Sequence, residues 1–190
     1  MEIIGIGHRK RVGKDEVGKI LYGLIKYSIN LEVGSNKIEI VSFADKIKDV
    51  AYQLYAVYGL QDKNYYELNA TERNIPLPHI NKTPRQIWID LGKAIRDVVH
   101  ENTWVDCVIQ EKRKCDYLLI TDVRFPDEAK AIKNKGGILL KVDNPSIPIE
   151  TDGADEVLAS FNGWDHIIMN DGTLEDLNYK VCNVWREMTK

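Results

Sequence analysis

Residues 2–16 read EIIGIGHRKRVGKDE, in which an apolar run stops at Gly7 and three consecutive cations precede Gly13. The run 2–6 is short and rich in isoleucine, which predicts a buried strand. Beyond Gly13 the apolar residues recur at spacings of three and four, as on one face of a helix. They are Val17, Ile20, Leu21, Leu24 and Ile25. A strand, a glycine-containing turn and a helix in this order are typical of a phosphate-binding loop.

The turn is close to the P-loop motif G-x-x-x-x-G-K-[ST]. Gly13 would let the backbone approach a phosphate, and Lys14 would reach the β- and γ-phosphates as a catalytic cation. His8 stands at the first glycine of the motif, and Asp15 at the Ser/Thr that binds Mg²⁺, a role that a carboxylate can also fill. We therefore predict an ATP phosphate site formed by His8, Arg9, Lys10, Arg11, Val12, Gly13, Lys14, Asp15 and Glu16. The alternative is a basic turn on a solvated face.

The rest of the chain alternates between strand and helix patterns. Strand-like runs lie at 37–42, 116–121, 138–142 and 166–169, and helical patterns lie at 47–57, 83–98, 103–112, 127–135 and 173–188. This alternation predicts an α/β fold with a parallel sheet and helices on both faces, in a single domain over 1–190. Ligands of such sheets bind at the carboxyl ends of the strands, so we searched for chemistry after residues 6, 42 and 121.

Composition narrows the function classes. The 190 residues carry 26 Lys and Arg against 29 Asp and Glu, a net charge of −3, which argues against a nucleic-acid-coating protein. Three cysteines without a C-x-x-C spacing argue against a disulfide framework or a structural zinc site, and favour a reducing cytoplasm. No secretory signal and no apolar run of about 18–20 residues is present, so we expect no membrane span.

A second candidate site follows the run LLIT at 118–121. Asp122 would stand at the end of a buried strand, where P-loop enzymes place an acid that organises Mg²⁺. Arg124, two residues on, could grip a second phosphate. We predict catalytic roles for both residues, and a metal-binding role for Asp122 as for Asp15. The alternative is that Asp122 caps the following helix.

Two further segments offer groups for an acceptor. Arg85 and Arg96 are eleven residues apart on the helix that Thr83-Pro84 opens, so they share a face that suits an anionic ligand. A solvated polar face is the alternative. Phe43 and Lys46 follow the second strand and could stack on a base and reach a phosphate, although Phe43 could equally be a core aromatic.

Taken together, these segments resemble the phage-encoded deoxynucleoside monophosphate kinases. The matching stretches are GKD at 13–15, SFADKIK at 42–48, TPRQ at 83–86 with LG at 91–92, WVD at 104–106, DVRFPDEA at 122–129 and NDGTL at 170–174. Their order and spacing hold over nearly the whole chain.

The resemblance implies a nucleoside monophosphate kinase fold with a parallel five-stranded core and the reaction ATP + dNMP → ADP + dNDP, with Mg²⁺ as cofactor. It implies that Arg85, Arg96 and Arg124 hold the acceptor phosphate. A helical substrate-binding region would lie at about 44–112 and a short lid at about 143–164. The partners would be ATP and a nucleoside monophosphate in the cytoplasm (that of the host, if phage-encoded), without nucleic acid or membrane. A homodimer is one option for the assembly state.

Three departures from the family keep other functions open. Glu16 replaces a threonine, the lid region keeps only the acids of Ala154-Asp155-Glu156, and residues 142–179 hold nine acids and no Lys or Arg. Arg9, Lys10 or Arg11 would then supply the cation that related kinases place near the lid. The alternatives are a phosphomevalonate kinase-like enzyme, a catalytically degenerate nucleotide-binding regulator, and a nucleic-acid-binding module. No short motif identifies the base.

Overall fold

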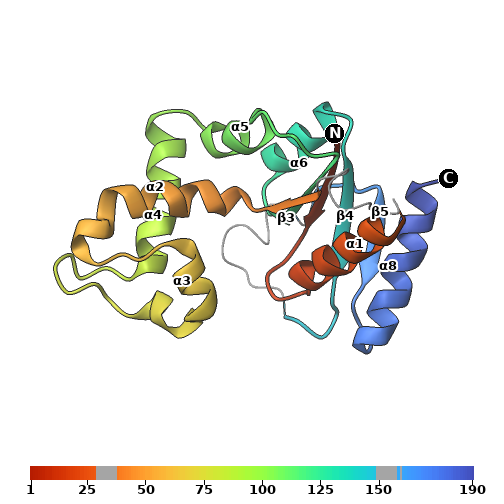
Figure 1. The fold of residues 1–190 in the computed structure, drawn as a ribbon, viewed down its shortest axis with the longest axis horizontal. Helices are drawn as coiled ribbons and strands as arrows, with labels where there is room; N and C mark the ends of the chain where they lie inside the picture. The colour runs from red at the N-terminus through yellow and green to blue at the C-terminus, as the bar shows by residue number, and fades with distance from the viewer. Residues whose placement is uncertain (29–37, 149–157, 159) are drawn as a thin grey trace. The chain divides into compact units, whose positions relative to one another are not determined.

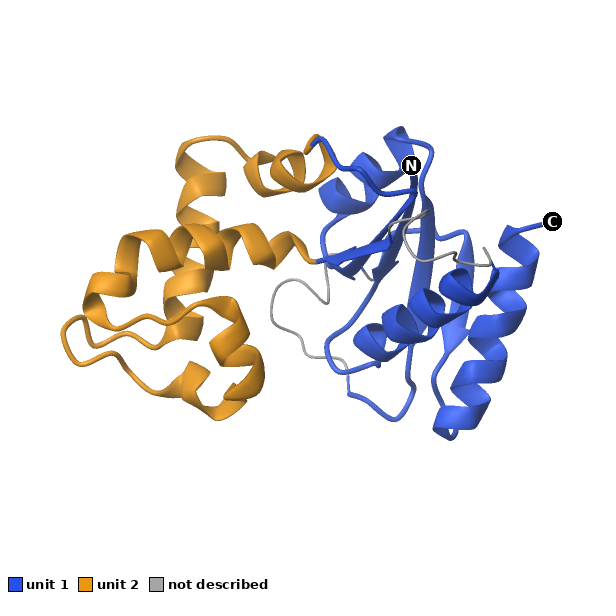
Figure 2. Ribbon diagram, in the orientation of Figure 1, with its two compact units in different colours: residues 1–41, 112–190 blue, residues 42–111 orange. Residues whose placement is uncertain are grey.

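The computed structural model describes residues 1–28, 38–148, 158 and 160–190. Within it the chain forms two compact units (Figure 2). Unit 1 comprises Met1–Val41 and Lys112–Lys190, and unit 2 comprises Ser42–Glu111. The predicted lid at 143–164 lies partly outside the described residues, and Ala154, Asp155 and Glu156 lie wholly outside them.

Unit 1 is built on a parallel five-stranded sheet in the order β2-β3-β1-β4-β5. The strands are β1 (Glu2–Gly7), β2 (Ile38–Val41), β3 (Tyr117–Val123), β4 (Ile138–Asp143) and β5 (His166–Met169). β1 is therefore the central strand, with β3 and β4 as its two neighbours. β3 is longer than the predicted 116–121, because Gly7 pairs with Val123 beyond a local register shift. Asp122 thus lies inside the last stretch of β3 rather than after it.

Helices cover both faces of this sheet, so the predicted fold class is confirmed (Figure 1). α1 (Lys14–Ser28) and α8 (Leu174–Met188) share a core with Ile4 and Ile6 of β1. Gly5 lies between those two residues, and its Cα faces Ile132 of α6 (Pro126–Asn134) on the opposite side. Successive strand residues point to opposite faces, which is why one apolar strand serves both layers.

Unit 2 is helical. It contains α2 (Phe43–Tyr55), η1 (Ala56–Tyr58), α3 (Lys63–Leu68), η2 (Ala70–Asn74), α4 (Pro84–Val98) and α5 (Thr103–Ile109). α2 begins four residues before the predicted 47, because Ser42 and Asp45 form a capping box. Thr83 and Gln86 cap α4 in the same way, as the sequence predicts for Thr83. The core of the unit comprises Ala51, Leu60, Tyr66, Leu77 and Ile87.

Two differences from the predicted helices concern their ends. α5 stops at Ile109 rather than 112, and Val98, the last residue of the predicted 83–98, is 83% exposed at the end of α4. Among the helices that the structure describes, none is both long and apolar enough to cross a membrane.

Candidate phosphate-binding site

The loop 8–13 leaves the carboxyl end of the central strand and leads directly into α1, which begins at Lys14. The first backbone N–H groups of a helix have no partner inside the helix, and the helix dipole is positive there, so this is a favourable place for a phosphate. Three loop residues have positive φ: His8 at 102°, Arg11 at 63° and Gly13 at 98°. The loop therefore has the irregular, tightly turned backbone that the motif predicts.

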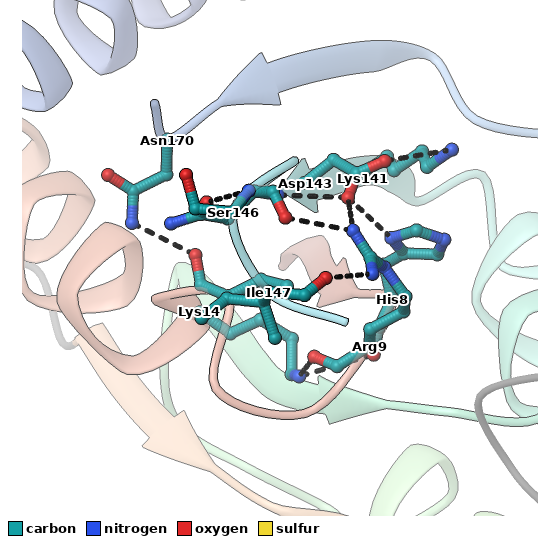
Figure 3. A network of polar contacts seen from close by, with 10 residues as sticks. His8, Arg9, Lys14, Lys141, Asp143, Ser146, Ile147 and Asn170 are labelled. Atoms are coloured by element: carbon teal, nitrogen blue, oxygen red, sulfur yellow. Dashed lines mark hydrogen bonds and ion pairs between the residues drawn. The ribbon is translucent and has the colours of Figure 1, made fainter. Parts of the chain in front are cut away.

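Gly13 is required by its surroundings as well as by its φ. A Cβ at this position would collide with the amide of Asn170, whose Nδ2 donates a hydrogen bond to the Val12 carbonyl at 3.0 Å (Figure 3). The backbone N–H of Asn170 in turn donates to the Asp143 carbonyl at 2.7 Å. Asn170 thus fixes the end of the loop, a positioning role that our sequence analysis did not assign. Its place directly after β5 is the signal that could have revealed it.

Lys14 crosses the inside of the loop. Its side chain is only 7% exposed, and its ammonium donates to the carbonyls of His8, at 3.2 Å, and Arg9. The structure thus places Lys14 at the predicted phosphate loop, and its contact with the β- and γ-phosphates stays a prediction. Val12 is fully buried in the core with α1, so its side chain anchors the loop and only its backbone is available to a phosphate.

Arg9 points away from the position of Lys14 (Figure 3). Its guanidinium binds the Asp143 carboxylate through Nη2, and donates to the carbonyls of Asn144 at 3.0 Å and Ile147 at 2.7 Å. The imidazole of His8 lies beside the same carboxylate, with Nδ1 3.7 Å from Asp143 Oδ1. Burial lowers the pKa of His8, and the charge of Lys141 lowers it further, so the imidazole is neutral at neutral pH.

The remaining predicted residues of the loop region are more accessible. Arg11 and Asp15 are exposed, and Lys10 and Glu16 are half-buried. Asp15 and Glu16 are in the first turn of α1, and Glu16 forms an ion pair with Lys19 at 3.3 Å. Their contacts with ATP and Mg²⁺ stay predictions.

Asp122 and Arg124 lie at the carboxyl end of β3, beside the loop. The backbone N–H of His8 donates to the Val123 carbonyl at 3.2 Å, which joins the loop to this strand. α1 also approaches here, since a Cβ on Gly18 would lie 2.8 Å from Thr121 Cγ2. The predicted phosphate loop and the predicted acid of β3 are thus brought together at one edge of the sheet.

Glu128 is a further buried acid that the sequence analysis did not single out. Its Oε2 accepts the backbone N–H groups of Arg124, at 2.7 Å, and Phe125, at 3.0 Å, as the capping carboxylate of α6. Because Phe125 is the N-cap and Glu128 reaches back to it, Asp122 is not the N-cap of this helix. Burial raises the pKa of Glu128 to about 8, and the charge of Asp122 contributes to the rise. Pro126 at the first position of the helix, with Glu128 at its third, was the missed signal.

The other predicted substrate residues belong to unit 2. Arg85 is exposed and Arg96 half-buried on α4. The face between them is not open: Gly92 is buried, a Cβ there would lie 3.0 Å from Ile47, and its carbonyl accepts Trp104 Nε1 at 3.0 Å.

Phe43 and Lys46 lie in the first turn and a half of α2. Phe43 is only 3% exposed, which favours the core interpretation over stacking on a base. Lys46 forms an ion pair with Glu111 at 3.4 Å. Binding of the acceptor by these two residues stays a prediction.

Mg²⁺ fits the chemistry of the acids at the loop. Among the described residues no group of three or more His, Cys, Asp and Glu side chains could hold a metal alone. Mg²⁺ in phosphoryl transfer is commonly held by one or two carboxylates with the substrate phosphates and water, and Asp122 and Asp15 could provide those carboxylates.

Comparison with known sequences finds a relative that is named as a kinase. No family model matches the sequence. A protein of Acanthamoeba polyphaga mimivirus, named provisionally as a deoxynucleotide monophosphate kinase, is 28% identical over 159 residues, or 75% of this chain and 80% of that protein.

Solved structures resemble the chain weakly. TT1252 from Thermus thermophilus is 17% identical, with a TM-score of 0.46 and coverage of 100% of this chain and 98% of that one. Shikimate kinase from Aquifex aeolicus is 14% identical, with a TM-score of 0.41 and the same coverage. The fold is therefore assigned from the strand order of the sheet and not from these structures.

Proposed function

We propose that this protein is an ATP-dependent kinase that transfers the γ-phosphoryl group of ATP to the phosphate of a deoxynucleoside monophosphate. One observation carries the proposal: Lys14, buried at the start of α1, lies inside a loop with a required Gly13, and Asp122 is the penultimate residue of the strand beside it. These are the parts with which P-loop enzymes bind and transfer phosphates. The name of the mimivirus relative agrees with the proposal.

In the proposed reaction an oxygen of the acceptor phosphate forms a bond to the γ-phosphorus, and the bond between that phosphorus and the β–γ bridging oxygen breaks. The attacking oxygen is already ionised, so the step needs positioning and charge rather than a general base. Lys14 and the N-terminus of α1 would hold the ATP phosphates. Arg124 would grip the acceptor, with Arg85 and Arg96 as its predicted partners from unit 2.

Mg²⁺, when bound with ATP, supplies charge neutralisation at the transferring group. Asp122 and Asp15 would hold it directly or through water. Since residues 142–179 contain no Lys or Arg, the remaining positive charge would come from the loop itself.

A second candidate function is a nucleotide-binding regulator without catalysis. The same absence of cations in 142–179 favours it, together with the engagement of Arg9 by Asp143. Both functions predict ATP binding, and only the kinase predicts ADP release with an acceptor.

A coupled assay of ADP release with MgATP and a panel of nucleoside monophosphates tests the proposal, with phosphomevalonate as a further acceptor. We expect release with one or a few deoxynucleoside monophosphates. Lys14→Ala should lower kcat by about 10³-fold while the circular dichroism spectrum is retained. Lys19→Ala, which changes an exposed lysine of the same helix, is the matched control and should leave kcat unchanged. ATP binding without release for any acceptor would support the regulator, and normal turnover by folded Lys14→Ala would refute the assignment.

A further inference from the structure

Arg9 is the second residue of the proposed phosphate loop 8–13, and its side chain binds other groups of the protein. It is 6% exposed, and its terminal nitrogens engage the Asp143 carboxylate and the carbonyls of Asn144 and Ile147 (Figure 3). Its Nε is buried without a hydrogen-bond partner in the described part of the chain. A guanidinium has five N–H groups, and here both terminal nitrogens already have oxygen partners.

Asp143 is placed to hold this arginine. It is the last residue of β4, and β4 pairs with the central strand through Gly7 and Lys141. Its Oδ1 also accepts the backbone N–H of Asn144 at 2.9 Å, and Lys141 Nζ lies 3.7 Å from Oδ2. The carboxylate therefore has charged and hydrogen-bonded partners on several sides. Withdrawal of Arg9 toward a bound phosphate would leave a half-buried acid short of its main partner, which is costly.

The backbone of Arg9 connects this pair to Lys14. The Arg9 carbonyl accepts a hydrogen bond from the Lys14 ammonium, while the Arg9 side chain is held by Asp143. One residue thus joins the proposed catalytic lysine to the end of β4 and to the chain at 144–147. A shift of the Arg9 side chain would move the carbonyl that positions Lys14.

We propose that Arg9 and Asp143 form a positioning pair that fixes the phosphate loop for ATP. In this arrangement Arg9 acts through the loop backbone and does not contact the phosphates, so the charge that faces the transferring phosphoryl group comes from Lys14 and from Lys10 or Arg11. The inference rests on the proposed function, because it takes the loop as the ATP phosphate site.

The test compares Arg9→Met, Asp143→Asn and the double variant in two measurements. Titration calorimetry with a non-hydrolysable ATP analogue and Mg²⁺ gives the affinity without an acceptor. Each single variant should weaken binding by about tenfold, and the double variant should be no weaker than either single, because the two residues act as one unit. In the ADP-release assay, both single variants should raise the KM for ATP and lower kcat by the same factor, no more than about tenfold, because both act through the position of Lys14.

Two further variants keep the result interpretable. Arg9→Lys retains the charge but not the forked geometry, so it should recover part of the affinity and serves if Arg9→Met does not fold. Asp165→Asn is the matched control. Asp165 also pairs with a cation, Lys133 at 2.8 Å, and accepts a strand N–H, from Leu139, but it lies at the amino ends of β4 and β5. It should lower stability without changing the affinity for the analogue.

Three outcomes would overturn the positioning role. One is a loss of kcat of about 100-fold in Arg9→Met that Asp143→Asn does not share, since this would make Arg9 a direct phosphate contact. The second is a double variant in which the losses of affinity from the two substitutions multiply, since the residues would then act independently. The third is an unchanged affinity for the analogue in both single variants. A wild-type protein that binds the analogue but never releases ADP would refute the proposed kinase function alone, because the calorimetric test needs no turnover.

Discussion

The two strands that flank the central strand end in opposite electrostatic settings. At the end of β4, Asp143 is surrounded by Arg9, Lys141 and the imidazole of His8. At the end of β3, Asp122 has a second acid nearby, Glu128, whose charged form is disfavoured by burial and by Asp122 itself. The acid at the end of β4 is thus surrounded by positive groups, whereas at the end of β3 the charge of Asp122 helps to keep Glu128 protonated.

The pKa directions express the same contrast. Burial alone would raise the pKa of Asp143, but the hydrogen bond from Arg9 and the surrounding positive charge lower it below its usual value. Glu128 is shifted upward, to about 8. Under the proposed function this gives a division of labour in which the β4 side would hold the phosphate loop and the β3 side would receive the metal. Substitutions on one side of the loop should therefore leave the other side intact.

The largest effect is expected for Asp122→Asn. Removal of the carboxylate that would hold Mg²⁺ should lower kcat at saturating MgATP by about 10³-fold, because metal stabilisation of the transferring group is lost. The protein should stay folded, since the amide has the same size as the carboxylate that it replaces. Steady-state kinetics and thermal denaturation check both parts. Asp143→Asn is the comparison variant, and equal losses of kcat in the two would break the division of labour.

Glu128→Gln should change the pH dependence of stability. A carboxyl whose folded pKa of about 8 exceeds its usual 4.5 binds its proton more tightly in the folded state. Its contribution to the free energy of unfolding is complete below the usual pKa and is lost as pH rises toward 8. The wild type should therefore lose on the order of 3 kcal/mol relative to the glutamine variant between about pH 5 and about pH 8.

Urea unfolding at the two pH values measures this difference. Glu67→Gln, which changes an exposed glutamate of α3, is the control and should follow the wild type. Parallel pH profiles of wild type and Glu128→Gln would show that the acid is not held in its protonated form.

Gly18→Ala tests the close approach of α1 to β3. The added methyl would lie 2.8 Å from Thr121 Cγ2, so the helix or the strand end must shift. The shift should lower the free energy of unfolding by about 1–3 kcal/mol, and the better helix propensity of alanine offsets up to about 1 kcal/mol of this loss. Gly23→Ala in the same helix has no heavy atom within 4 Å and should stabilise by about 0.5–1 kcal/mol. Denaturant unfolding of both variants should thus give changes of opposite sign. A stabilising Gly18→Ala would show that this contact is loose.

Local signals were sufficient for most of the fold. The isoleucine run of β1, the stripe of α1 and the cap at Thr83 each predict an element that the structure contains. The ends of the helices and strands were less predictable, because they depend on contacts with residues distant in sequence. β3 continues to Val123 only because Gly7 pairs with it, and Val98 is exposed because no other element covers the last turn of α4 among the described residues.

For the candidate site, motif spacing predicts Gly13 and Lys14, and the position at a strand end predicts Asp122. The structure brings the loop and this strand end together, and the roles of the three residues stay predictions. The strand-end rule was not applied to the strand that ends at Asp143 or to Asn170 after β5, and both contact the loop. Periodicity could not show that Arg9 turns toward β4, since the acceptors at Asp143, Asn144 and Ile147 lie more than 130 positions away.

The smallest effect is expected on the β4 side, for His8→Asn. His8 has a φ of 102°, and asparagine is among the residues that tolerate positive φ. Because burial and Lys141 lower the pKa of His8, its neutral form stabilises the fold above the usual value of 6.5, and this contribution is lost as pH falls through that value. The lowered pKa of Asp143 acts only at more acidic pH, so the two groups can be separated.

The unfolding free energy of the wild type should therefore drop more than that of His8→Asn between about pH 7.5 and about pH 5.5. The sign is opposite to that predicted for Glu128, since one side of the loop loses stability on acidification and the other on alkalinisation. His79→Asn, which changes an exposed histidine of unit 2, is the control. Identical slopes for wild type and His8→Asn would mean that His8 titrates as in the unfolded chain, so that neither its burial nor the charge of Lys141 disfavours its protonated form.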